Sequence, residues 1–210
     1  MQEVPNLSIV VGLTGQTGAG KTTVSKILKE QKISVIDADQ VARTVVDTGT
    51  QCLSDLALEF SISILNHDGT LNREKMAELV FSDREKLKRL NKIIFPYILK
   101  EISQKIEALK KEGKPLIVLD APTLIESGAY RMCDKVISVL APENERINRI
   151  VMRDRISYDA AQKRVNSQHP DSFYIEKSQY LIHNTGDLRD LRIQTLDVLN
   201  KLGHMPSVQQ

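Results

Sequence analysis

The stretch Gly15–Thr22, which reads GQTGAGKT, constrains the fold of this chain more than any other segment. It matches G-x-x-x-x-G-K-[ST], the pattern of a phosphate-binding loop. An apolar run over residues 7–13 precedes it and is typical of a buried parallel strand, and the apolar residues Val24, Ile27 and Leu28 follow it at helical spacing. The sequence therefore predicts a strand, a loop and a helix whose backbone N–H groups together bind phosphate.

The residue types within this loop fit a nucleoside triphosphate. Glycine at positions 15, 18 and 20 lets the backbone bend tightly and bring its N–H groups against phosphate oxygens. Lys21 is expected to bridge the outer phosphates, and the Thr22 hydroxyl is expected to bind Mg²⁺. The predicted nucleotide contacts are the residues of the loop and of the first helical turn, namely Gly15, Gln16, Thr17, Gly18, Ala19, Gly20, Lys21, Thr22 and Thr23.

The overall composition is that of an ordinary globular protein. Of its 210 residues, 41% are hydrophobic and 27% charged, and the net charge is +2, so nothing demands a nucleic-acid or membrane partner. No apolar run is long enough to cross a bilayer. Because the first strand begins within the first ten residues, which leaves no room for a presequence, we expect a cytoplasmic protein. Cys52 and Cys133 lack metal-like spacing and are expected to be inert thiols.

Four further apolar segments alternate with helical patterns and predict the rest of a sheet, over residues 33–36, 116–119, 135–140 and 179–182. The expected fold is a doubly wound α/β fold with five parallel strands. We expect a single domain over residues 1–210, with its core at 1–50, 114–141 and 177–204, a helical substrate-binding insert at 51–113 and a helical lid at 142–176. Pro96 predicts a kink or two abutting helices within the insert, and Gly113 predicts a helix C-cap.

Aspartates follow two of the predicted strands. Asp37 and Asp39 come after the segment 33–36, and Asp120 comes after a later strand. Because ligands bind beyond the carboxyl ends of parallel strands, all three are expected near the phosphate-binding loop. Two alternatives stay open from the residues alone. One aspartate of the first pair could instead cap a helix that starts near Gln40, and Asp120 could either hold Mg²⁺ or only brace the loop.

An arginine-rich helix follows residue 142. Arg149 and Arg153 are four residues apart and share one helix face, which is expected to close on phosphates, because the planar guanidinium group contacts phosphate oxygens in pairs. Arg146 and Arg155 are expected on the solvated face. The segment therefore predicts a lid.

Several of these pieces together resemble the dephospho-coenzyme A kinase family. The resemblance covers most of the chain, and its most specific element is the D-A-D segment. It is carried by Val35-Ile36-Asp37-Ala38-Asp39 with Ala42-Arg43, Leu119 to Glu126 (LDAPTLIE), Arg149 with Arg153-Asp154, Arg164 to Gln168 (RVNSQ), and Asn184-Thr185-Gly186. Two positions depart from the family's pattern. Phe95-Pro96 stands where the family often has His-Pro, and Thr123 replaces a usual leucine, so a role for that histidine cannot be carried over.

The resemblance implies a P-loop fold similar to that of nucleoside monophosphate kinases, and ATP-dependent phosphorylation of the ribose 3′-hydroxyl of dephospho-CoA with Mg²⁺. The implied catalytic residues are Asp39, as the base, with Lys21, Arg149 and Arg153. The implied substrate-binding residues are Asp37, Asp39 and Arg43, and the implied metal ligands are Thr22 and Asp120. The small-molecule substrate is the expected partner of a monomeric enzyme, without nucleic acid or membrane.

Three other interpretations of the function are open from the sequence. The first is another nucleotide or small-molecule kinase of the same fold. The second is a regulatory ATPase or GTPase, although guanine selectivity needs N-K-x-D, and Asn91-Lys92-Ile93-Ile94 lacks the aspartate. The third is a nucleotide-binding module without catalysis, against which the joint presence of Lys21, Thr22, Asp39 and the arginine helix argues.

Overall fold

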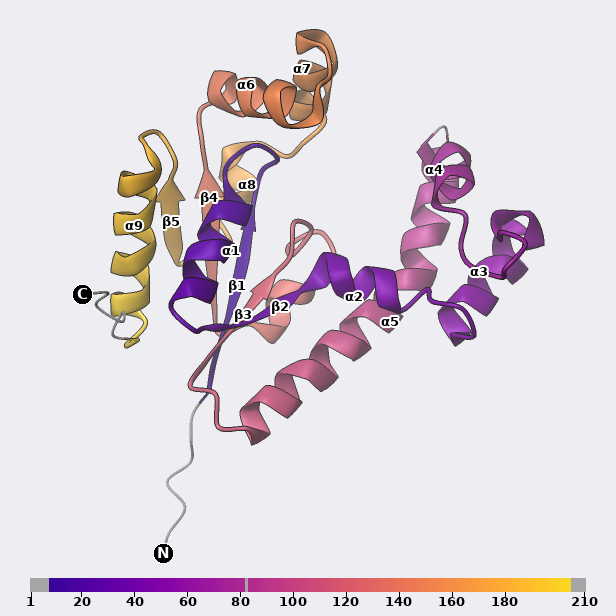
Figure 1. The fold of residues 1–210 in the computed structure, drawn as a ribbon, viewed down its shortest axis with the longest axis horizontal. Coiled ribbons are helices and arrows are strands. Elements are labelled where there is room, and N and C mark those ends of the chain that lie inside the picture. The colour runs from indigo at the N-terminus through magenta and orange to yellow at the C-terminus, as the bar shows by residue number, and fades with distance from the viewer. Residues whose placement is uncertain (1–7, 82, 205–210) are drawn as a thin grey trace, which may run out of the picture. The chain divides into compact units, whose positions relative to one another are not determined.

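The computed structural model describes residues 8–81 and 83–204. The chain divides into two compact units, of which unit 1 comprises Met1–Ile36 and Ile106–Gln210 and unit 2 comprises Asp37–Lys105. Figure 1 shows the helices and strands along the chain.

A five-stranded sheet is the framework of unit 1, with the strand order β2-β3-β1-β4-β5. The pairs β1–β3, β1–β4 and β4–β5 are parallel. The five strands are β1 (Ile9–Gly15), β2 (Ser34–Asp37), β3 (Leu116–Asp120), β4 (Lys135–Leu140) and β5 (Tyr180–His183). All five predicted strands are confirmed, although β1 continues to Gly15 and residue 7 of its predicted range lies outside the described residues.

Helices cover both faces of this sheet, as the expected doubly wound fold requires. The helices of unit 1 are α1 (Lys21–Glu30), α6 (Glu143–Asp154), α7 (Tyr158–Asn166), α8 (Asp171–Ile175) and α9 (Leu188–Lys201), with a short 3₁₀ helix η2 (Ala129–Met132), and of these α1 and α9 pack on one face and α8 on the other. Neighbouring strand residues point to opposite faces. Val139 and Ile182 pack in a core cluster with residues of α1 and α9, whereas Leu140 packs with Tyr174 of α8.

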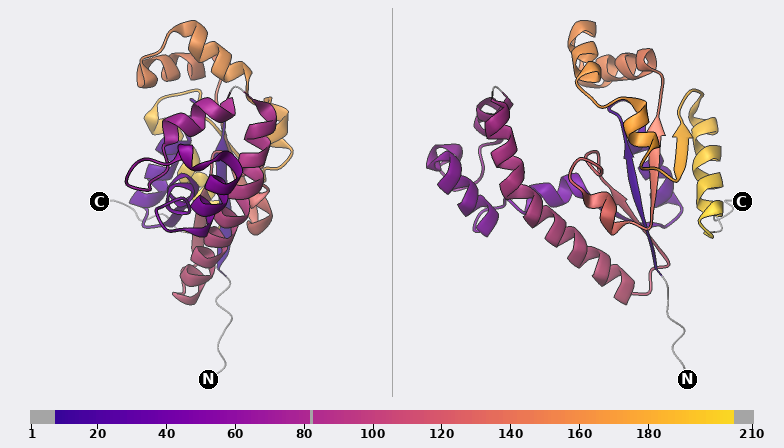
Figure 2. Two further views of the ribbon diagram at one scale, coloured as in Figure 1. Left: turned by 90° about the vertical axis from the view of Figure 1, so that its right-hand side faces the viewer. Right: turned by 180° about the vertical axis from the view of Figure 1, so that it is seen from behind.

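The helices α6 and α7 have a small core of their own. Ile147 and Ile150 of α6 pack against Ala161 and Val165 of α7, and all four are buried. Figures 1 and 2 show these two helices beyond the end of the sheet at which β1 leads into α1. The predicted lid, 142–176, contains α6, α7 and α8, and its function as a lid stays a prediction.

Unit 2 is helical. Its elements are α2 (Ala38–Thr44), α3 (Gln51–Phe60), a 3₁₀ helix η1 (Ile62–Ile64), α4 (Arg73–Phe81) and α5 (Arg84–Lys111), which ends beyond the unit. Its core contains Val46, Cys52, Leu56, Ile64, Met76 and Val80. The predicted insert, 51–113, overlaps most of this unit, and its role in binding substrate stays a prediction.

Helix α5 continues through Pro96, so the expected alternative of two separate helices at this proline is wrong. The proline removes one backbone donor, but apolar residues on both sides of it, such as Leu90, Ile94 and Tyr97, pack on the core of unit 2 and hold the helix together. The predicted C-cap is confirmed. Gly113 has a φ of 72°, and the N–H of Lys114 donates to Leu109 O at 3.1 Å.

Candidate active site

The loop between β1 and α1 has a backbone that only glycine adopts readily. Gly15, Gly18 and Gly20 have φ angles of 154°, 78° and 103°. A Cβ atom at position 15 would lie 2.4 Å from Val139 O, and one at position 18 would lie 2.6 Å from Arg146 O. Both neighbours are backbone atoms, which cannot move aside cheaply. The φ angles of the loop therefore favour glycine at these positions, and the nearby backbone atoms leave no room for a side chain at Gly15 and Gly18.

The first turn of α1 is an anion site by its construction. Gly20 is the N-cap residue, and the first turn contains no acidic side chain that would neutralise the positive end of the helix dipole. Ala19 is buried, whereas Thr22 is exposed. The unpaired N–H groups of this turn, with the adjacent Lys21, form the type of site that binds phosphate.

Lys21 contacts the carboxylate at the end of the neighbouring strand. Its Nζ lies 2.5 Å from Asp120 Oδ1, and the two side chains are only 15% and 9% exposed. The sheet register explains the meeting, since Asp120 is paired with Leu13 of β1, just before the loop begins. The structure thus places Asp120 beside the loop, as expected, and whether it holds Mg²⁺ or only braces the loop stays a prediction.

Among the described residues, no group of three or more His, Cys, Asp or Glu side chains could hold an ion. Mg²⁺ is normally bound by one or two carboxylates together with substrate phosphates, so it does not need such a cage. The Asp120 carboxylate and the Thr22 hydroxyl are oxygen donors of the type that Mg²⁺ prefers.

The two predicted lid arginines lie in different surroundings. Arg149 donates from Nη1 to Gly18 O at 3.4 Å and from Nη2 to Asn184 O at 3.3 Å, so it contacts the loop directly. Arg153, in the last turn of α6, is 57% exposed and pairs with Asp154 through two hydrogen bonds of 2.7 and 2.9 Å. The structure thus brings Arg149, but not Arg153, against the loop.

The expectation that Arg146 lies on a solvated face is wrong. The residue is 4% exposed, because the start of α6 packs on the phosphate-binding loop at Gly18. Burial lowers the pKa of Arg146, while the negative charges of Asp171 and Glu143 oppose this shift. Arg155 is exposed, as expected.

The predicted acidic segment after β2 lies in unit 2. Asp37 is the N-cap of α2, and its Oδ1 accepts hydrogen bonds from the N–H groups of Asp39 at 2.9 Å and Gln40 at 3.1 Å. The capping aspartate is therefore Asp37, and the helix starts at Ala38 rather than near Gln40. Asp39 is exposed in the first turn of α2, and Arg43 is exposed one turn later. Any contact of Asp37, Asp39 or Arg43 with substrate stays a prediction.

Two residues that contact the loop entered the sequence analysis only within segments that carry the family resemblance, with no role assigned to them. Asn184 donates from Nδ2 to Ala19 O at 2.8 Å, and it is buried. Gln168 accepts the N–H of Thr17 at 2.8 Å, and this N–H was predicted to contact nucleotide. Asn184 directly follows β5, so its place at the carboxyl edge of the sheet was a usable signal. Gln168 follows a helix rather than a strand, so apart from the RVNSQ segment it gave no signal of its own.

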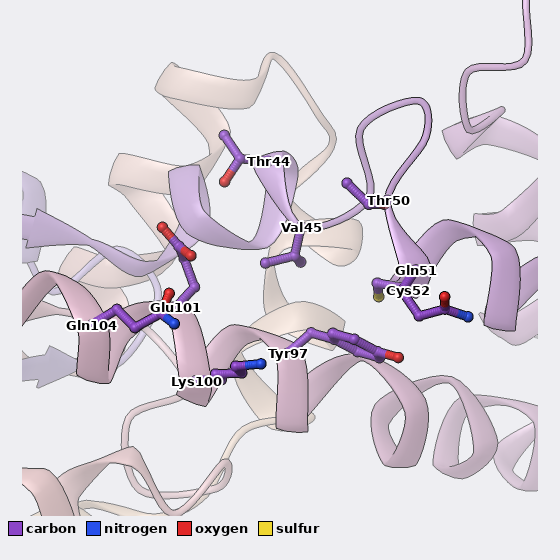
Figure 3. Close-up of a pocket in the computed structure, with 9 residues that line it drawn as sticks. All are labelled: Thr44, Val45, Thr50, Gln51, Cys52, Tyr97, Lys100, Glu101 and Gln104. Carbon is purple, nitrogen blue, oxygen red and sulfur yellow. The ribbon is translucent and has the colours of Figure 1, made fainter.

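A pocket of about 420 Å³ lies within unit 2. Figure 3 shows the side chains that line it, from α2, α3, α5 and the segment that joins α2 to α3, which are Thr44, Val45, Thr50, Gln51, Cys52, Tyr97, Lys100, Glu101 and Gln104. Two of the lining residues, Tyr97 and Gln51, donate hydrogen bonds to the Asp55 carboxylate at 2.5 and 2.8 Å, and these bonds lower the pKa of Asp55. The lining is mixed, with amide, charged and aromatic groups.

The fold and the loop together define the class of this protein. A parallel sheet with the order β2-β3-β1-β4-β5, a glycine-rich loop between β1 and α1, and a lysine beside a carboxylate at the end of β3 are the parts of a P-loop phosphotransferase. The described residues include no helix that is both long and apolar enough to cross a membrane.

Comparisons with known proteins give the family. The family model for dephospho-CoA kinase matches residues 9–190. A dephospho-CoA kinase from Carboxydothermus hydrogenoformans is 38% identical over 192 residues, which cover 91% of this chain and 93% of the relative. The crystal structure of TT1252 from Thermus thermophilus aligns with a TM-score of 0.79 at 30% identity, over 93% of this chain and 98% of that one. A dephospho-CoA kinase from Campylobacter jejuni gives 0.70 at 29% identity, over 92% and 96%. The chain belongs to the dephospho-CoA kinase family.

Proposed function

We propose that this protein transfers the terminal phosphoryl group of ATP to the ribose 3′-hydroxyl of dephospho-CoA, giving coenzyme A and ADP. The observation that carries the proposal is the family match over residues 9–190, which spans both the phosphate-binding loop and the helical unit 2. The loop supplies the site for the phosphoryl donor, and we infer the identity of the acceptor from the family.

The residues around the loop would act by holding charge in place. Phosphoryl transfer requires little covalent chemistry from the protein, so positioning and electrostatic stabilisation account for most of the rate. Lys21 would neutralise the outer phosphates, and Arg149 would contact these phosphates from α6. Arg153 would also contact the phosphates once its ion pair with Asp154 is broken. Thr22 and Asp120 would hold Mg²⁺, which when bound supplies further neutralisation of the phosphate charge.

The acceptor hydroxyl needs a base. A sugar hydroxyl is a poor nucleophile, and a carboxylate that orients it and accepts its proton raises its reactivity. We propose Asp39 for this role and Arg43, one helical turn away on α2, as a contact for the acceptor's pyrophosphate. Asp37 fixes the start of α2 and so sets the position of Asp39. The mixed pocket of unit 2 is our candidate for the amide-containing arm of the acceptor.

A substrate panel tests the reaction. ADP release is measured with dephospho-CoA, AMP, CMP, adenosine, shikimate and no acceptor. We expect kcat/KM for dephospho-CoA to exceed that for each alternative by at least about 100-fold, since the other acceptors leave polar groups of the site unpaired. Equal rates with AMP or shikimate would support another kinase of this fold, and equal rates without any acceptor would support a regulatory ATPase.

The Asp39→Asn variant tests the base. The amide is the same size but cannot accept the proton, so kcat should fall by about 10²–10⁴-fold while the KM for ATP stays near the wild-type value. Asp47→Asn removes an exposed carboxylate shortly after α2 and is the matched control. Near-normal turnover by Asp39→Asn would overturn the assignment.

We also propose that the protein acts as a monomer and in the cytoplasm. Light scattering tests the oligomeric state, and cell fractionation tests the location.

A further inference from the structure

Hydrogen bonds join the phosphate-binding loop to the segment that leads from α7 into α8, and in each of them the loop donates and a residue of 168–171 accepts. Gln168 reaches from the turn to the loop, where its Oε1 accepts the Thr17 N–H at 2.8 Å. Gln16 reaches from the loop to the turn, where its Nε2 donates to His169 O at 3.2 Å and to Asp171 Oδ1 at 2.9 Å. Three hydrogen bonds from two glutamines thus join the first half of the loop to residues 168–171. We refer to this group as the glutamine clasp.

The clasp is buried at Gln16, which makes the hydrogen bonds of this side chain difficult to replace. Gln16 is only 3% exposed, so water cannot readily take the place of its partners. The turn itself is held by the ring of His169, which stacks on that of Phe173 with 3.9 Å between the centroids. Asp171 also lies near enough to the buried Arg146 to oppose the fall of its pKa, so one carboxylate serves both the clasp and the start of α6.

The clasp engages only one half of the loop. Its contacts end at Thr17 and do not involve the N–H groups at the start of α1. A helix N-terminus of this kind is where anions bind. Gly18, which follows Thr17 directly, has a left-handed backbone packed on Arg146. Fixing Thr17 therefore fixes the backbone that leads into this closely packed glycine, and with it the direction in which the later N–H groups point.

We propose that Gln16, Gln168 and Asp171 are positioning residues that hold the phosphate-binding loop in the conformation that accepts ATP. They act through the loop and do not touch the reacting atoms. The inference rests on the proposed use of ATP, but it does not depend on the identity of the acceptor.

A loop held ready before ATP arrives has a defined kinetic consequence. If the clasp is broken, only a fraction of molecules holds the competent loop, and the apparent affinity for ATP falls by that fraction. At saturating ATP the nucleotide itself restores the loop. We therefore expect the KM for ATP to rise about tenfold and kcat to change by less than about twofold when either glutamine is replaced by methionine, which keeps the length of the side chain but removes its amide.

The test uses Gln16→Met, Gln168→Met and, as the matched control, Gln162→Met on α7. Binding of a non-hydrolysable ATP analogue is measured by calorimetry without acceptor, and steady-state constants are measured with dephospho-CoA. The first two variants should bind the analogue about tenfold more weakly, and the control should bind within about twofold of wild type. Because binding is measured without acceptor, failure of the proposed phosphoryl acceptor would leave this result intact.

A conservative pair at Asp171 separates the hydrogen bond from general packing. Asp171→Asn keeps an oxygen that accepts from Gln16, so it should retain ATP-analogue affinity within about threefold, whereas Asp171→Ala removes one of the two bonds of Gln16 and should lose more than Asp171→Asn but less than Gln16→Met. Wild-type affinity in both methionine variants would overturn the proposal. A loss of kcat at unchanged KM in these variants, or an equal loss in Asp171→Asn and Asp171→Ala, would also overturn it.

Discussion

Lys21 Nζ lies 2.5 Å from Asp120 Oδ1, so the lysine proposed to bind phosphate contacts the carboxylate at the end of the neighbouring strand. The contact follows from the sheet, because the parallel register of β1 and β3 carries the ends of both strands to one edge. Both side chains are largely buried. The carboxylate is thereby held where it can serve the loop, a bound ion, or both.

Asp120→Asn distinguishes these roles. The amide keeps the shape of the side chain but removes the negative charge. The substitution therefore weakens both the binding of a metal ion by residue 120 and its ion pair with Lys21. We expect the Mg²⁺ concentration for half-maximal activity to rise at least about tenfold, as titration of ADP release against Mg²⁺ would show. Asp197→Asn is the matched control, since it removes an exposed carboxylate that pairs with Lys201 at 2.7 Å. An unchanged Mg²⁺ requirement with a lowered stability would mean that Asp120 only braces the loop.

Gly18→Ala should destabilise the protein by more than backbone strain alone. The added Cβ would need a left-handed backbone, which costs about 1–2 kcal/mol, and would lie 2.6 Å from Arg146 O. Gly49 is the matched control, because its φ of 86° is close to the 78° of Gly18 but its Cβ would meet nothing within 4 Å. Urea unfolding should give a loss of about 1–2 kcal/mol for Gly49→Ala and about 1–3 kcal/mol more for Gly18→Ala. Equal losses would contradict the close packing of α6 on the loop.

Much of this site could be predicted from local pattern. The strand, loop and helix around Gly15–Thr22 follow from glycine spacing and apolar runs, and Asp120 follows from its place directly after a strand. Arg146 could not be placed in this way. It lies in a helix rich in charge, and its burial depends on how α6 packs on Gly18, which is a tertiary contact. Gln168 was missed for the same reason, since its partner Thr17 is 151 residues away. The continuity of α5 through Pro96 likewise depends on the core of unit 2 rather than on local propensity.

The two predicted lid arginines should differ when each is replaced by alanine. Arg149→Ala removes hydrogen bonds to Gly18 O and Asn184 O, so it should lower both kcat and the protection of the loop against amide hydrogen exchange without nucleotide. Arg153→Ala removes an exposed group that contacts Asp154, so it should lower kcat but leave this protection unchanged. We expect losses in kcat of about 10²-fold or more for each. The exposed Arg155 supplies the control, and a loss of protection in Arg153→Ala would contradict the separate surroundings of the two arginines.

The link between α6 and α7 should weaken in acid. Asp154 is held by Arg153 at 2.7 Å and by Arg164 at 2.5 Å, and these bonds and charges lower its pKa from 3.8 to about 2. A carboxyl group whose pKa is lowered by folding binds fewer protons in the folded state, so it stabilises the protein above pH 3.8, and this contribution is lost as the pH falls through about 2. Asp154→Asn removes the charge at every pH. The difference in unfolding free energy between wild type and this variant, measured by urea denaturation from pH 7 to pH 2, should therefore shrink as the pH falls through this range. The exposed Asp159 of α7 supplies the control variant, Asp159→Asn, and a difference for Asp154→Asn that stays constant with pH would contradict the role of these ion pairs.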